Sequence, residues 1–513
     1  MNTRLFAALD VGSYEIVMKI VEFTNGTMKV VDCVRYRLDL GSYTYSTGKL
    51  PMDKVNELCS LLKKFADIMK SYHITEYKAY GTSAIRETRN THILLDQIEQ
   101  RTGIRIDVLS NSEQRFLNYK AAASVGREFT DTITKGTAII DIGGGSIQIS
   151  LFDNDRLNVT QNIKLGVMRL RESLNEFNVK SGQRKTILDE MIGTQLRIFD
   201  KLYLKNRKIR NLLIVDDYVS PIIDNRTRDS EKRGFVTAER FDAFFNRLAE
   251  MNPVDFSRKY SIPEENIPLV FVSAAIIRNA VTMTGAGNIW CPKSELTDGI
   301  AYEYAEQNML ISNEHNFEED IVACAFNIAG RYMSDEDRSH TLERIATTIY
   351  DSMKSIHGMN DRDRLCLRLS TILHDCGKYI SLYNLATCSY DIIMSTEIIG
   401  LSHKEREIVA NVVKYTYLLG GSVTDIPREL GMDEDAYMRI VKLTAILRIA
   451  NGLDKSRKKK FEGIKSELKN DRLVITVRTN EDISFERGIF VRRADFFEEV
   501  YNIRPEINHI ARL

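Results

Sequence analysis

One strand-and-turn pattern occurs twice in the N-terminal half and constrains the fold more than any other feature of the chain. Residues 6–13 and 137–146 each form an apolar stretch that ends in Asp, an aliphatic residue, one or more Gly, and Ser. An alternating stretch follows each of them, at 16–21 and at 147–152. A strand–turn–strand unit used twice, about one domain apart, predicts two similar α/β lobes that face each other.

The composition is that of a globular chain with several domains. Of the 513 residues, 43% are hydrophobic and 28% are charged, which excludes a disordered chain. Lys and Arg number 71, as do Asp and Glu, so a protein that mainly coats nucleic acid is not expected. No apolar run approaches the ~20 residues of a membrane span, and seven scattered Cys indicate reduced thiols. We therefore expect a cytoplasmic protein with no membrane and no specific nucleic acid as partner.

Changes of pattern along the chain predict four segments. These are 1–128, a first α/β lobe; 129–312, a second α/β lobe; 313–458, an all-α domain; and 459–513, a small α+β cap. Within the cap, 472–477 and 483–490 alternate like strands, and 494–501 has the spacing of a helix.

The second glycine turn, Asp141–Ser146, is the strongest local signal for chemistry. Successive glycines let the backbone approach an anion closely, and their N–H groups form an anion-binding nest. A carboxylate such as that of Asp141 can hold hydrated Mg²⁺ against phosphate oxygens. The turn is not a P-loop, because no Gly-Lys-Ser/Thr follows, and not a dinucleotide fingerprint, because a strand follows it. Together with the turn at Asp10 it predicts a phosphate site between the lobes; the alternative is a plain glycine-rich hairpin.

Further motifs accompany the two turns in a fixed order. They lie at 81–90, 109–114, 165–170 and 294–299. In this order the sequence resembles the exopolyphosphatase/guanosine pentaphosphate phosphohydrolase family of the actin-like, sugar-kinase-like superfamily. The resemblance implies two actin-like (ribonuclease H-like) lobes with a cleft between them, and a divalent cation, Mg²⁺. It also implies release of terminal orthophosphate from inorganic polyphosphate, or of a phosphate from guanosine pentaphosphate.

The same resemblance implies roles for individual residues. Asp10 and Asp141 would hold the divalent cation. Arg86 would pair with a phosphate through its bidentate guanidinium, or else form a salt bridge between the lobes. The residues implied to cradle phosphate oxygens are Gly12, Ser13, Gly143, Gly144, Gly145 and Ser146.

Departures from the family pattern bear on activity. The two carboxylates expected to activate water read Gln114 and Gln148, and an amide orients water but cannot accept its proton. Glu113 or Glu15 would then supply the base, or no protein base is needed. Residues 215–218 replace a Gly-Gly-Thr turn and are predicted to narrow or reshape the far wall of the cleft. Two hypotheses follow: a phosphoric-anhydride hydrolase, or a catalytically impaired regulatory protein that binds polyphosphate or guanosine tetra- or pentaphosphate.

A second candidate metal site lies in the helical half. His340 followed by His374 and Asp375 resembles the HD metal-dependent phosphohydrolases, and the helical domain in longer members of the exopolyphosphatase family. Adjacent His and Asp can both reach one divalent ion. The later Asp that such a site needs reads Asn451, with Asp454 one turn on. The alternative is a buried pair, His374 and Asp375, that fixes helix packing.

A basic run after the last long predicted helix, Lys455–Lys460, permits two interpretations. It is either a track for a long polyanion or a solvated linker. A third hypothesis for the whole protein is an HD-type phosphohydrolase that the N-terminal lobes regulate. We also expect a homodimer.

Overall fold

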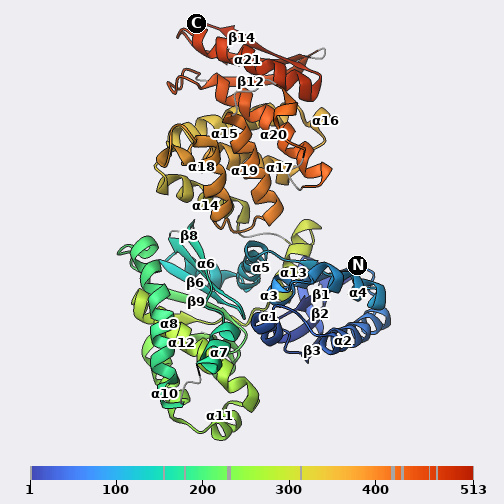
Figure 1. The fold of residues 1–513 in the computed structure, drawn as a ribbon, viewed down its shortest axis with the longest axis vertical. Helices are drawn as coiled ribbons and strands as arrows, with labels where there is room; N and C mark the ends of the chain where they lie inside the picture. Colours follow the sequence, from blue (N-terminus) through green and yellow to red (C-terminus); the bar gives the residue numbers. More distant parts are fainter. Residues whose placement is uncertain are drawn as a thin grey trace. The chain divides into compact units, whose positions relative to one another are not determined.

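The computed structural model divides the chain into two compact units, Met1–Asn316 and Phe317–Leu513. The boundary lies close to the predicted one at 312. Figure 1 shows the helices and strands of both units, and each unit is considered by itself. The residues described are 3–153, 156–177, 181–227, 233–311, 315–417, 422–428, 432–461, 463–469 and 472–511.

The first lobe is built on a five-stranded sheet with the order β3-β2-β1-β4-β5. Its strands are β1 (Arg4–Val11), β2 (Glu15–Thr24), β3 (Thr27–Arg37), β4 (Tyr77–Gly81) and β5 (Asp107–Val108). Its helices are α1 (Gly41–Thr47), α2 (Met52–Ser71), α3 (Ser83–Glu87), α4 (Thr91–Thr102), α5 (Asn111–Ala123) and α6 (Arg127–Ile133). Strands β1 to β3 form an antiparallel meander, and β1 pairs in parallel with β4.

The second lobe repeats this arrangement in a six-stranded sheet with the order β10-β11-β9-β6-β7-β8. Its strands are β6 (Thr137–Ile142), β7 (Ile147–Asp153), β8 (Arg156–Ile163), β9 (Asn211–Asp216), β10 (Phe235–Thr237) and β11 (Asn288–Trp290). Its helices are α7 (Val167–Glu176), α8 (Arg184–Phe199), α9 (Ser220–Arg226), α10 (Ala238–Glu250), α11 (Pro253–Tyr260) and α12 (Ile267–Thr284). Strands β6, β7 and β8 form a meander and β6 pairs in parallel with β9, so the predicted repeat of the two lobes is confirmed.

Strand β1 is buried on both faces because helices cover each side of its sheet. Ala7 and Leu9 belong to a core that includes α2 and α4 residues, whereas Phe6 and Ala8 belong to a core with α5 and α13 (Leu296–Gln307). Alternate side chains of a strand point to opposite faces, which explains this division. The Asp10 turn therefore leaves a strand that packing fixes on both sides.

Helix α13 corrects the predicted end of the second lobe. Its residues lie inside the predicted segment 129–312, yet they pack on the first lobe. The ring of Tyr304 stacks on that of Phe6, with ring centroids 3.9 Å apart. Ile300 and Ala305 join the same core. The chain thus crosses back to cover the second face of the first sheet, which the order of motifs did not reveal.

One helix has the length and composition of a candidate membrane span. It covers Glu264–Thr284, and 61% of its apolar window is buried inside the structure. The polar residues Asn266 and Arg278 interrupt it, so its continuous apolar run stays shorter than a membrane span. Its buried side chains, among them Leu269 and Ile276, belong to the core of the second lobe, which is the position of a central core helix.

The C-terminal unit is a helical bundle followed by a small sheet. Its helices are α14 (Phe317–Arg331), α15 (Glu336–Ser352), α16 (Lys354–His357), α17 (Asp361–Leu373), α18 (Leu385–Ser395), α19 (His403–Tyr417), α20 (Glu434–Leu453) and α21 (Ser484–Tyr501). Its strands are β12 (Gly463–Lys469), β13 (Arg472–Arg478) and β14 (Arg504–Ile510). Helix α20 is buried along most of its length and forms the centre of the bundle.

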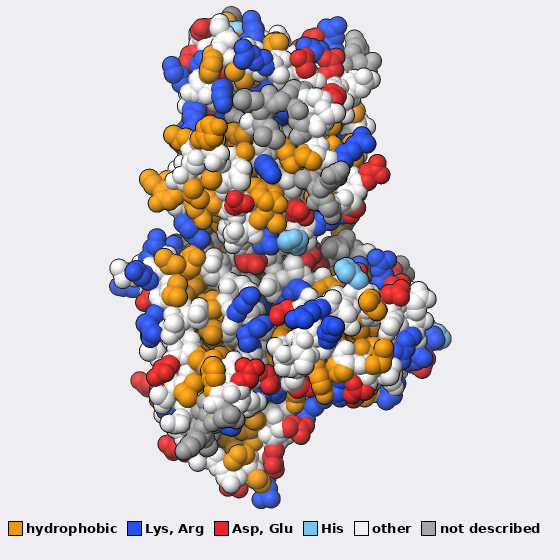
Figure 2. All heavy atoms as spheres, viewed as in Figure 1, with side chains coloured by type: hydrophobic (Ala, Val, Ile, Leu, Met, Phe, Trp, Pro, Cys, Tyr) orange, Lys and Arg blue, Asp and Glu red, His pale blue; other side chains and the backbone are white. Residues whose placement is uncertain are grey.

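The predicted strand at 483–490 is wrong. Residues 484–490 form the first part of α21 and Ile483 is its N-cap; Ile483, Glu486 and Phe490 are buried at helical spacing. Strand β13 was predicted correctly, and β14 pairs with it in parallel. On the face shown in Figure 2, basic and acidic side chains are interspersed over both units, as equal numbers of the two charges lead one to expect.

Candidate functional site

The two glycine turns meet around one cavity in the N-terminal unit. The cavity has a volume of about 100 Å³ and is lined from the first lobe by Asp10 and Ser13 and from the second by Asp141, Gly143 and Gly144. Both turns follow the corresponding central strands, β1 and β6, of the two related sheets. The structure therefore brings the predicted turns together, as two facing lobes require.

The first turn approaches the second closely at Gly144, and Gly166 lies directly against the second turn. A Cβ atom on Gly144 would lie 3.2 Å from the Cβ of Ser13, and one on Gly166 would lie 2.2 Å from the carbonyl oxygen of Gly144. The hydroxyl of Ser13 is hydrogen-bonded to that of Tyr45 at 2.8 Å and to that of Ser83 at 2.9 Å. The Ser13 side chain is thus fixed at the mouth of the second turn.

Backbone hydrogen bonds shape both turns in the same way. The N–H of Gly12 donates to the carbonyl of Glu15 at 3.0 Å, and that of Gly143 donates to the carbonyl of Ser146 at 3.0 Å. Within the described chain the N–H of Gly144 has no intramolecular acceptor. Because Gly144 also lines the cavity, its N–H group is available to an anion there.

Not all of the predicted cradle lines the cavity. Gly12, Ser13, Gly143 and Gly144 do so. A Cβ atom on Gly145 would instead lie 3.2 Å from Glu87 and from Tyr45, so this glycine faces the first lobe. The backbone carbonyl and hydroxyl of Ser146 are acceptors for Arg115.

Arg115 forms an ion pair with Asp141, the residue that the sequence analysis assigned to a metal. Its Nη1 donates to Oδ1 of Asp141, and the Nδ2 of Asn118 donates to Oδ2 at 2.7 Å. The Nη2 of Arg115 donates to the carbonyl of Ser146 at 2.8 Å. Arg115 is only 4% exposed, so the pair is shielded from water. Both oxygens of Asp141 are therefore satisfied by side chains of α5.

This pairing engages both oxygens of Asp141, so a cation at the predicted Asp10–Asp141 metal site would have to displace Arg115, and the ligand role of Asp141 stays a prediction. Among the described residues, no group of three or more His, Cys, Asp or Glu side chains is arranged to hold a metal ion. Asp10 differs from Asp141, since its Oδ1 is buried without a hydrogen-bond partner. Burial, reinforced by the charge of Glu295, raises the pKa of Asp10 to about 7. One carboxylate oxygen is thus left open to a water or a cation.

The four candidates for activating water separate into two groups. Gln114 and Glu15 line the cavity, and Oε2 of Glu15 accepts from Nη1 of Arg35 at 2.8 Å. Glu113 does not line it, because its carboxylate accepts from the backbone N–H of Ser110 at 2.9 Å and caps α5.

Gln148 also lies off the cavity. Its Nε2 donates to the hydroxyl of Thr160 at 2.6 Å, and the residue is buried in the second sheet, opposite Asp141 in the β6–β7 register. The predicted pair of amides at one water is therefore wrong, and Gln114 alone lies at the cavity.

Arg86 contacts the start of α5 in this structure, and its predicted pairing with a phosphate stays a prediction. Its Nη1 donates to the carbonyl of Leu109 at 2.6 Å, and its Nη2 donates to the side chain of Asn111 at 2.5 Å. Gln114 accepts a longer bond from the same Nη1 at 3.4 Å. Arg86 thus fixes the start of α5 within the first lobe.

The second lobe contributes a wall of the cavity, and the predicted narrowing by this wall stays a prediction. Residues 215–218 all line the cavity. Asp216 accepts from the N–H groups of Tyr218 at 3.0 Å and Ser220 at 3.3 Å and so caps the turn before α9. The acidic residues that line the cavity are Asp10, Glu15, Asp141, Asp216, Asp217 and Glu295, and the basic ones are Arg35 and Arg115. A polyanion entering this acidic site would need cations or protons beside it.

Comparisons with known proteins identify the family to which the chain belongs. A family model described as "Ppx/GppA phosphatase family" matches residues 19–285, and one described as "Ppx/GppA phosphatase, domain III" matches residues 323–489. The chain belongs to the Ppx/GppA phosphatase family. This is a family of hydrolases, which agrees with the enzyme class expected from the sequence.

Individual relatives of this Ppx/GppA chain are distant. It is 27% identical to exopolyphosphatase 1 of Mycobacterium leprae over 194 residues, which cover 37% of this chain and 55% of that protein. It is 19% identical to the guanosine-5'-triphosphate,3'-diphosphate pyrophosphatase of Vibrio atlanticus over 460 residues, which cover 87% of this chain and 86% of that protein. The chain therefore aligns with about half of the first relative and with most of the second.

Solved structures support the fold of the Ppx/GppA unit. The Aquifex aeolicus family member has a TM-score of 0.50 at 15% identity and covers 60% of this chain and 99% of its own. An exopolyphosphatase from Cytophaga hutchinsonii has a TM-score of 0.50 at 16% identity and covers 60% of this chain and all of its own. These similarities show the actin-like, two-lobed α/β fold.

The second candidate metal site of this Ppx/GppA protein is not assembled. His340 is 55% exposed at its side chain and lies against Phe326, with ring centroids 4.5 Å apart, between Glu336 and Glu343. Its inclusion with His374 and Asp375 was wrong, because its position on α15 directs the ring to the surface.

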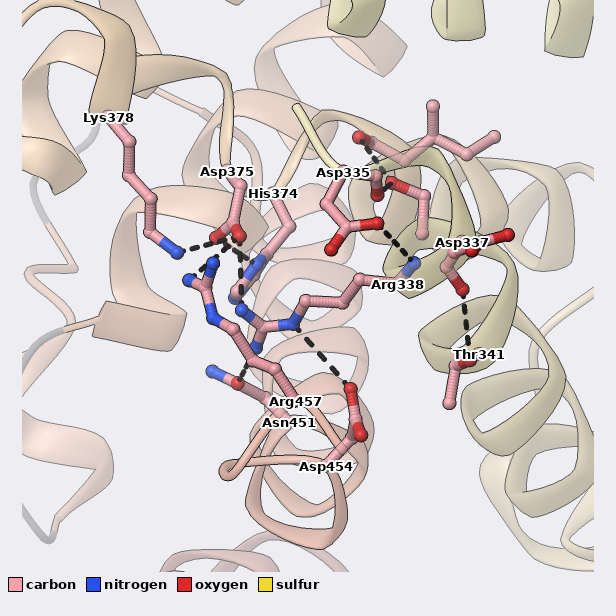
Figure 3. Close-up of polar contacts among 12 residues, drawn as sticks. Asp335, Asp337, Arg338, Thr341, His374, Asp375, Lys378, Asn451, Asp454 and Arg457 are labelled. Carbon is pink, nitrogen blue, oxygen red and sulfur yellow. Dashed lines mark hydrogen bonds and ion pairs between the residues drawn. The ribbon is translucent and has the colours of Figure 1, made fainter. Parts of the chain in front are cut away.

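An arginine two residues earlier reaches the His-Asp pair instead. Nη1 of Arg338 donates to Oδ2 of Asp375 at 3.0 Å, and its Nη2 donates to Oδ1 of Asn451 at 2.9 Å. Its Nε lies 3.7 Å from Asp454. Figure 3 shows this guanidinium between the His374–Asp375 corner and the end of α20. The alternative prediction of a buried pair that fixes helix packing is supported.

Neither arginine was found from the sequence. Arg115 directly follows Gln114, and Arg338 precedes His340 by two residues, so each lies beside a sequence motif. One signal could have found them. Each arginine accompanies a position at which an amide replaces the expected carboxylate: Arg115 accompanies Gln114, and Arg338 accompanies Asn451.

Proposed function

We propose that this protein is a phosphohydrolase that releases the terminal orthophosphate of inorganic polyphosphate or guanosine pentaphosphate at the cavity between the two glycine turns. Membership in the Ppx/GppA phosphatase family supports the reaction class. The observation that carries the proposal is the contact of the turns at Ser13 and Gly144 around a single cavity. Its volume of about 100 Å³ is below the ~300 Å³ of common small-molecule pockets, so it takes one phosphoryl end group and leaves the rest of the substrate outside.

Different residues of the cavity have different roles in the proposed phosphoryl transfer. The N–H of Gly144 donates to a phosphate oxygen, and the Ser13 hydroxyl borders the same end group. The Gln114 amide orients the attacking water, whose proton passes to the phosphate itself, because phosphoryl transfer depends mainly on positioning and charge stabilisation. A divalent cation, when bound, would neutralise phosphate charge. Asp10, with its open Oδ1, is the predicted ligand that remains available to hold it.

The second candidate function is a regulatory protein that binds the same phosphate chain without cleaving it. The ion pair between Arg115 and Asp141 favours it, because it removes one predicted metal ligand. The amide at Gln114 favours it as well, since no carboxylate stands there. The cytoplasmic location and the homodimer stay predictions from the sequence.

The test is the initial rate of orthophosphate release from long-chain polyphosphate and from guanosine pentaphosphate, with Mg²⁺, beside a binding measurement for each. Gly144→Val should abolish both turnover and binding, because the side chain would collide with Ser13 and Met168. Gly330→Val in α14 is the matched control, since a Cβ atom there meets nothing within 4 Å. Binding without turnover in the wild type would favour the regulatory protein, and wild-type rates in Gly144→Val would overturn the site.

A further inference from the structure

Four buried oxygen atoms at the cavity between the glycine turns have no hydrogen-bond partner among the residues that the structure describes. They are Oδ1 of Asp10, Oδ1 of Asn118, Oγ of Ser294 and Oγ1 of Thr297, and all four residues line the cavity. Asn118 and Ser294 are each 8% exposed, and Thr297 is 1% exposed. Native proteins rarely leave buried polar atoms without a partner, so four of them at one cavity indicate an occupant.

The elements that carry these oxygens pack together in the first lobe. Ala8 of β1, Leu117 of α5 and Leu296 of α13 belong to one core cluster. A Cβ atom on Gly299 of α13 would lie 2.0 Å from the carbonyl oxygen of Leu117, so the two helices are in backbone contact there. This core therefore holds β1, α5 and α13 in fixed positions beside the cavity.

Each unpartnered oxygen belongs to a residue next to that core. Asp10 lies two residues beyond the core residue of β1 and hence on the same face of the strand. Asn118 and Thr297 directly follow core residues of α5 and α13, and Ser294 lies two residues before α13 begins. The four residues thus form one first-lobe wall of the cavity, which we call the oxygen wall.

Asp10 is the acidic residue of the oxygen wall, and the cations around it are engaged elsewhere. Arg35 pairs with Glu15 at 2.8 Å and with Glu295 at 2.7 Å, and Lys19 pairs with Glu295 at 2.9 Å. In the described part of the chain no basic side chain forms an ion pair with Asp10. A buried carboxylate oxygen without a partner is costly, which favours a positively charged occupant.

The chemistry of the oxygen wall selects a cation over an anion. The Nδ2 of Asn118 donates to Oδ2 of Asp141 at 2.7 Å, so this amide can offer the cavity only its oxygen. That oxygen and the open oxygen of Asp10 are acceptors, which repel an anion. The hydroxyls of Ser294 and Thr297 offer lone pairs as well. Hard divalent cations such as Mg²⁺ take carboxylate, amide and hydroxyl oxygens and keep several waters.

We propose that Asp10 and three neutral oxygens of the first lobe bind one Mg²⁺ ion, directly or through its water shell. The neutral ligands are Oδ1 of Asn118, Oγ of Ser294 and Oγ1 of Thr297. Asp141 is not needed, because both of its oxygens are engaged by α5. The inference rests on the proposed function only for the role of the ion, which is to neutralise phosphate charge. Binding of the ion itself depends on neither substrate nor turnover.

The experiment titrates the full-length protein with Mn²⁺, as a probe for Mg²⁺, without any phosphate compound, and follows free Mn²⁺ by electron paramagnetic resonance. The wild type should bind one Mn²⁺ that Mg²⁺ displaces. Thr297→Val, which replaces the hydroxyl by a methyl group of similar size, should weaken binding about fivefold to tenfold, and Ser294→Ala should act in the same direction. Thr284→Val is the matched control and should leave the affinity unchanged, because the Thr284 hydroxyl donates to the carbonyl of Ala280 at 2.8 Å, away from the cavity.

Two further variants separate the oxygen wall from a site that uses both glycine turns. Asp10→Asn should weaken Mn²⁺ binding about tenfold or more, whereas Asp141→Asn should weaken it far less. Mn²⁺ binding in a protein that cleaves neither polyphosphate nor guanosine pentaphosphate would support the site and overturn only the proposed function. No Mn²⁺ bound to the wild type, equal affinity in the wild type, Thr297→Val and Ser294→Ala, or a larger loss in Asp141→Asn than in Asp10→Asn would each overturn the proposal.

Discussion

Arg115 and Asp141 stand on different lobes of the N-terminal unit and form a buried ion pair, in which Nη1 of the arginine donates to Oδ1 of the carboxylate. Asn118, one turn further along α5, takes the other oxygen at 2.7 Å. The helix that presents Gln114 is therefore attached to the second glycine turn. The protein's own guanidinium neutralises the carboxylate that the sequence had assigned to a divalent cation.

Arg115→Ala should convert Asp141 into a cation ligand. Removing one partner of a buried pair costs about 3–5 kcal/mol, so the metal-free variant should unfold at a lower temperature than the wild type. Mg²⁺ or Mn²⁺ should restore part of that stability, because the Asp141 carboxylate, left without its arginine, then has a counter-ion. Thermal unfolding with and without Mg²⁺, and Mn²⁺ binding followed by electron paramagnetic resonance, measure both effects.

The control for this prediction is Arg278→Ala. Arg278 pairs with Asp189 and Asp242 near the surface of the second lobe, so its loss should cost at most about 1 kcal/mol, with no rescue by metal. Equal Mn²⁺ affinity in the wild type and in Arg115→Ala would show that the arginine does not exclude the cation.

Gln114→Glu should raise the turnover number, because it places a carboxylate at the cavity where the amide now stands. A well-placed general base is worth about 10²–10⁴-fold in rate. Gln148→Glu should give no such gain, and should cost about 1–3 kcal/mol of stability, because that side chain is buried in the second sheet. The rate of orthophosphate release at saturating substrate, measured for both variants, tests this prediction. A higher rate in Gln148→Glu, or an unchanged rate in Gln114→Glu, would contradict the placement of Gln114 at the attacking water.

Asp10→Asn should change how stability depends on pH. The pKa of Asp10 is raised from 3.8 to about 7, so between these values the folded state binds more protons than the unfolded state. Stability then falls as pH rises through this window. The variant removes that loss, and above about pH 7 it should be more stable than the wild type by about 1–3 kcal/mol. Urea unfolding at about pH 5 and about pH 8 tests this; identical slopes for both proteins would be incompatible with a buried, unpartnered Asp10.

Arg338→His combined with Asn451→Asp should create a metal site in the C-terminal unit. The two changes place an imidazole and a carboxylate beside His374 and Asp375, which together supply the donors that divalent transition metals prefer. Isothermal titration with Mn²⁺ should find one more metal per chain in the double variant than in the wild type. His340→Ala serves as control and should change stability by less than about 0.5 kcal/mol, because that side chain is exposed. A metal site lost with His340 would contradict the structure.

Much of the fold followed from the sequence because hydrophobic periodicity and turn residues are local signals. The meander β1–β3, helix α2 and the repeat of the Asp10 turn at Asp141 could be predicted in this way. The return of α13 to the first lobe could not be predicted, because the contacting residues Phe6 and Tyr304 lie near opposite ends of the sequence of the N-terminal unit. Residues 483–490 were mistaken for a strand, since apolar residues in a short window fit both periods.

The site was predictable in its backbone and not in its side-chain partners. The glycine turns have their own sequence signature, and the structure places Ser13 and Gly144 in contact. Whether Asp141 faces a metal or an arginine depends on α5 of the other lobe. The residues around Asp141 in the sequence carry no information about that helix. Likewise, Arg338 rather than His340 points into the bundle because of the phase of α15.

The most direct test of the account is the product of guanosine pentaphosphate turnover, followed by ³¹P nuclear magnetic resonance with Mg²⁺ present. The wild-type protein should release one orthophosphate for each guanosine tetraphosphate formed, and Gly144→Val should release none while remaining folded. Pyrophosphate as the product, or equal release by the two proteins, would contradict a terminal-phosphate hydrolase at the cavity between the Asp10 and Asp141 turns.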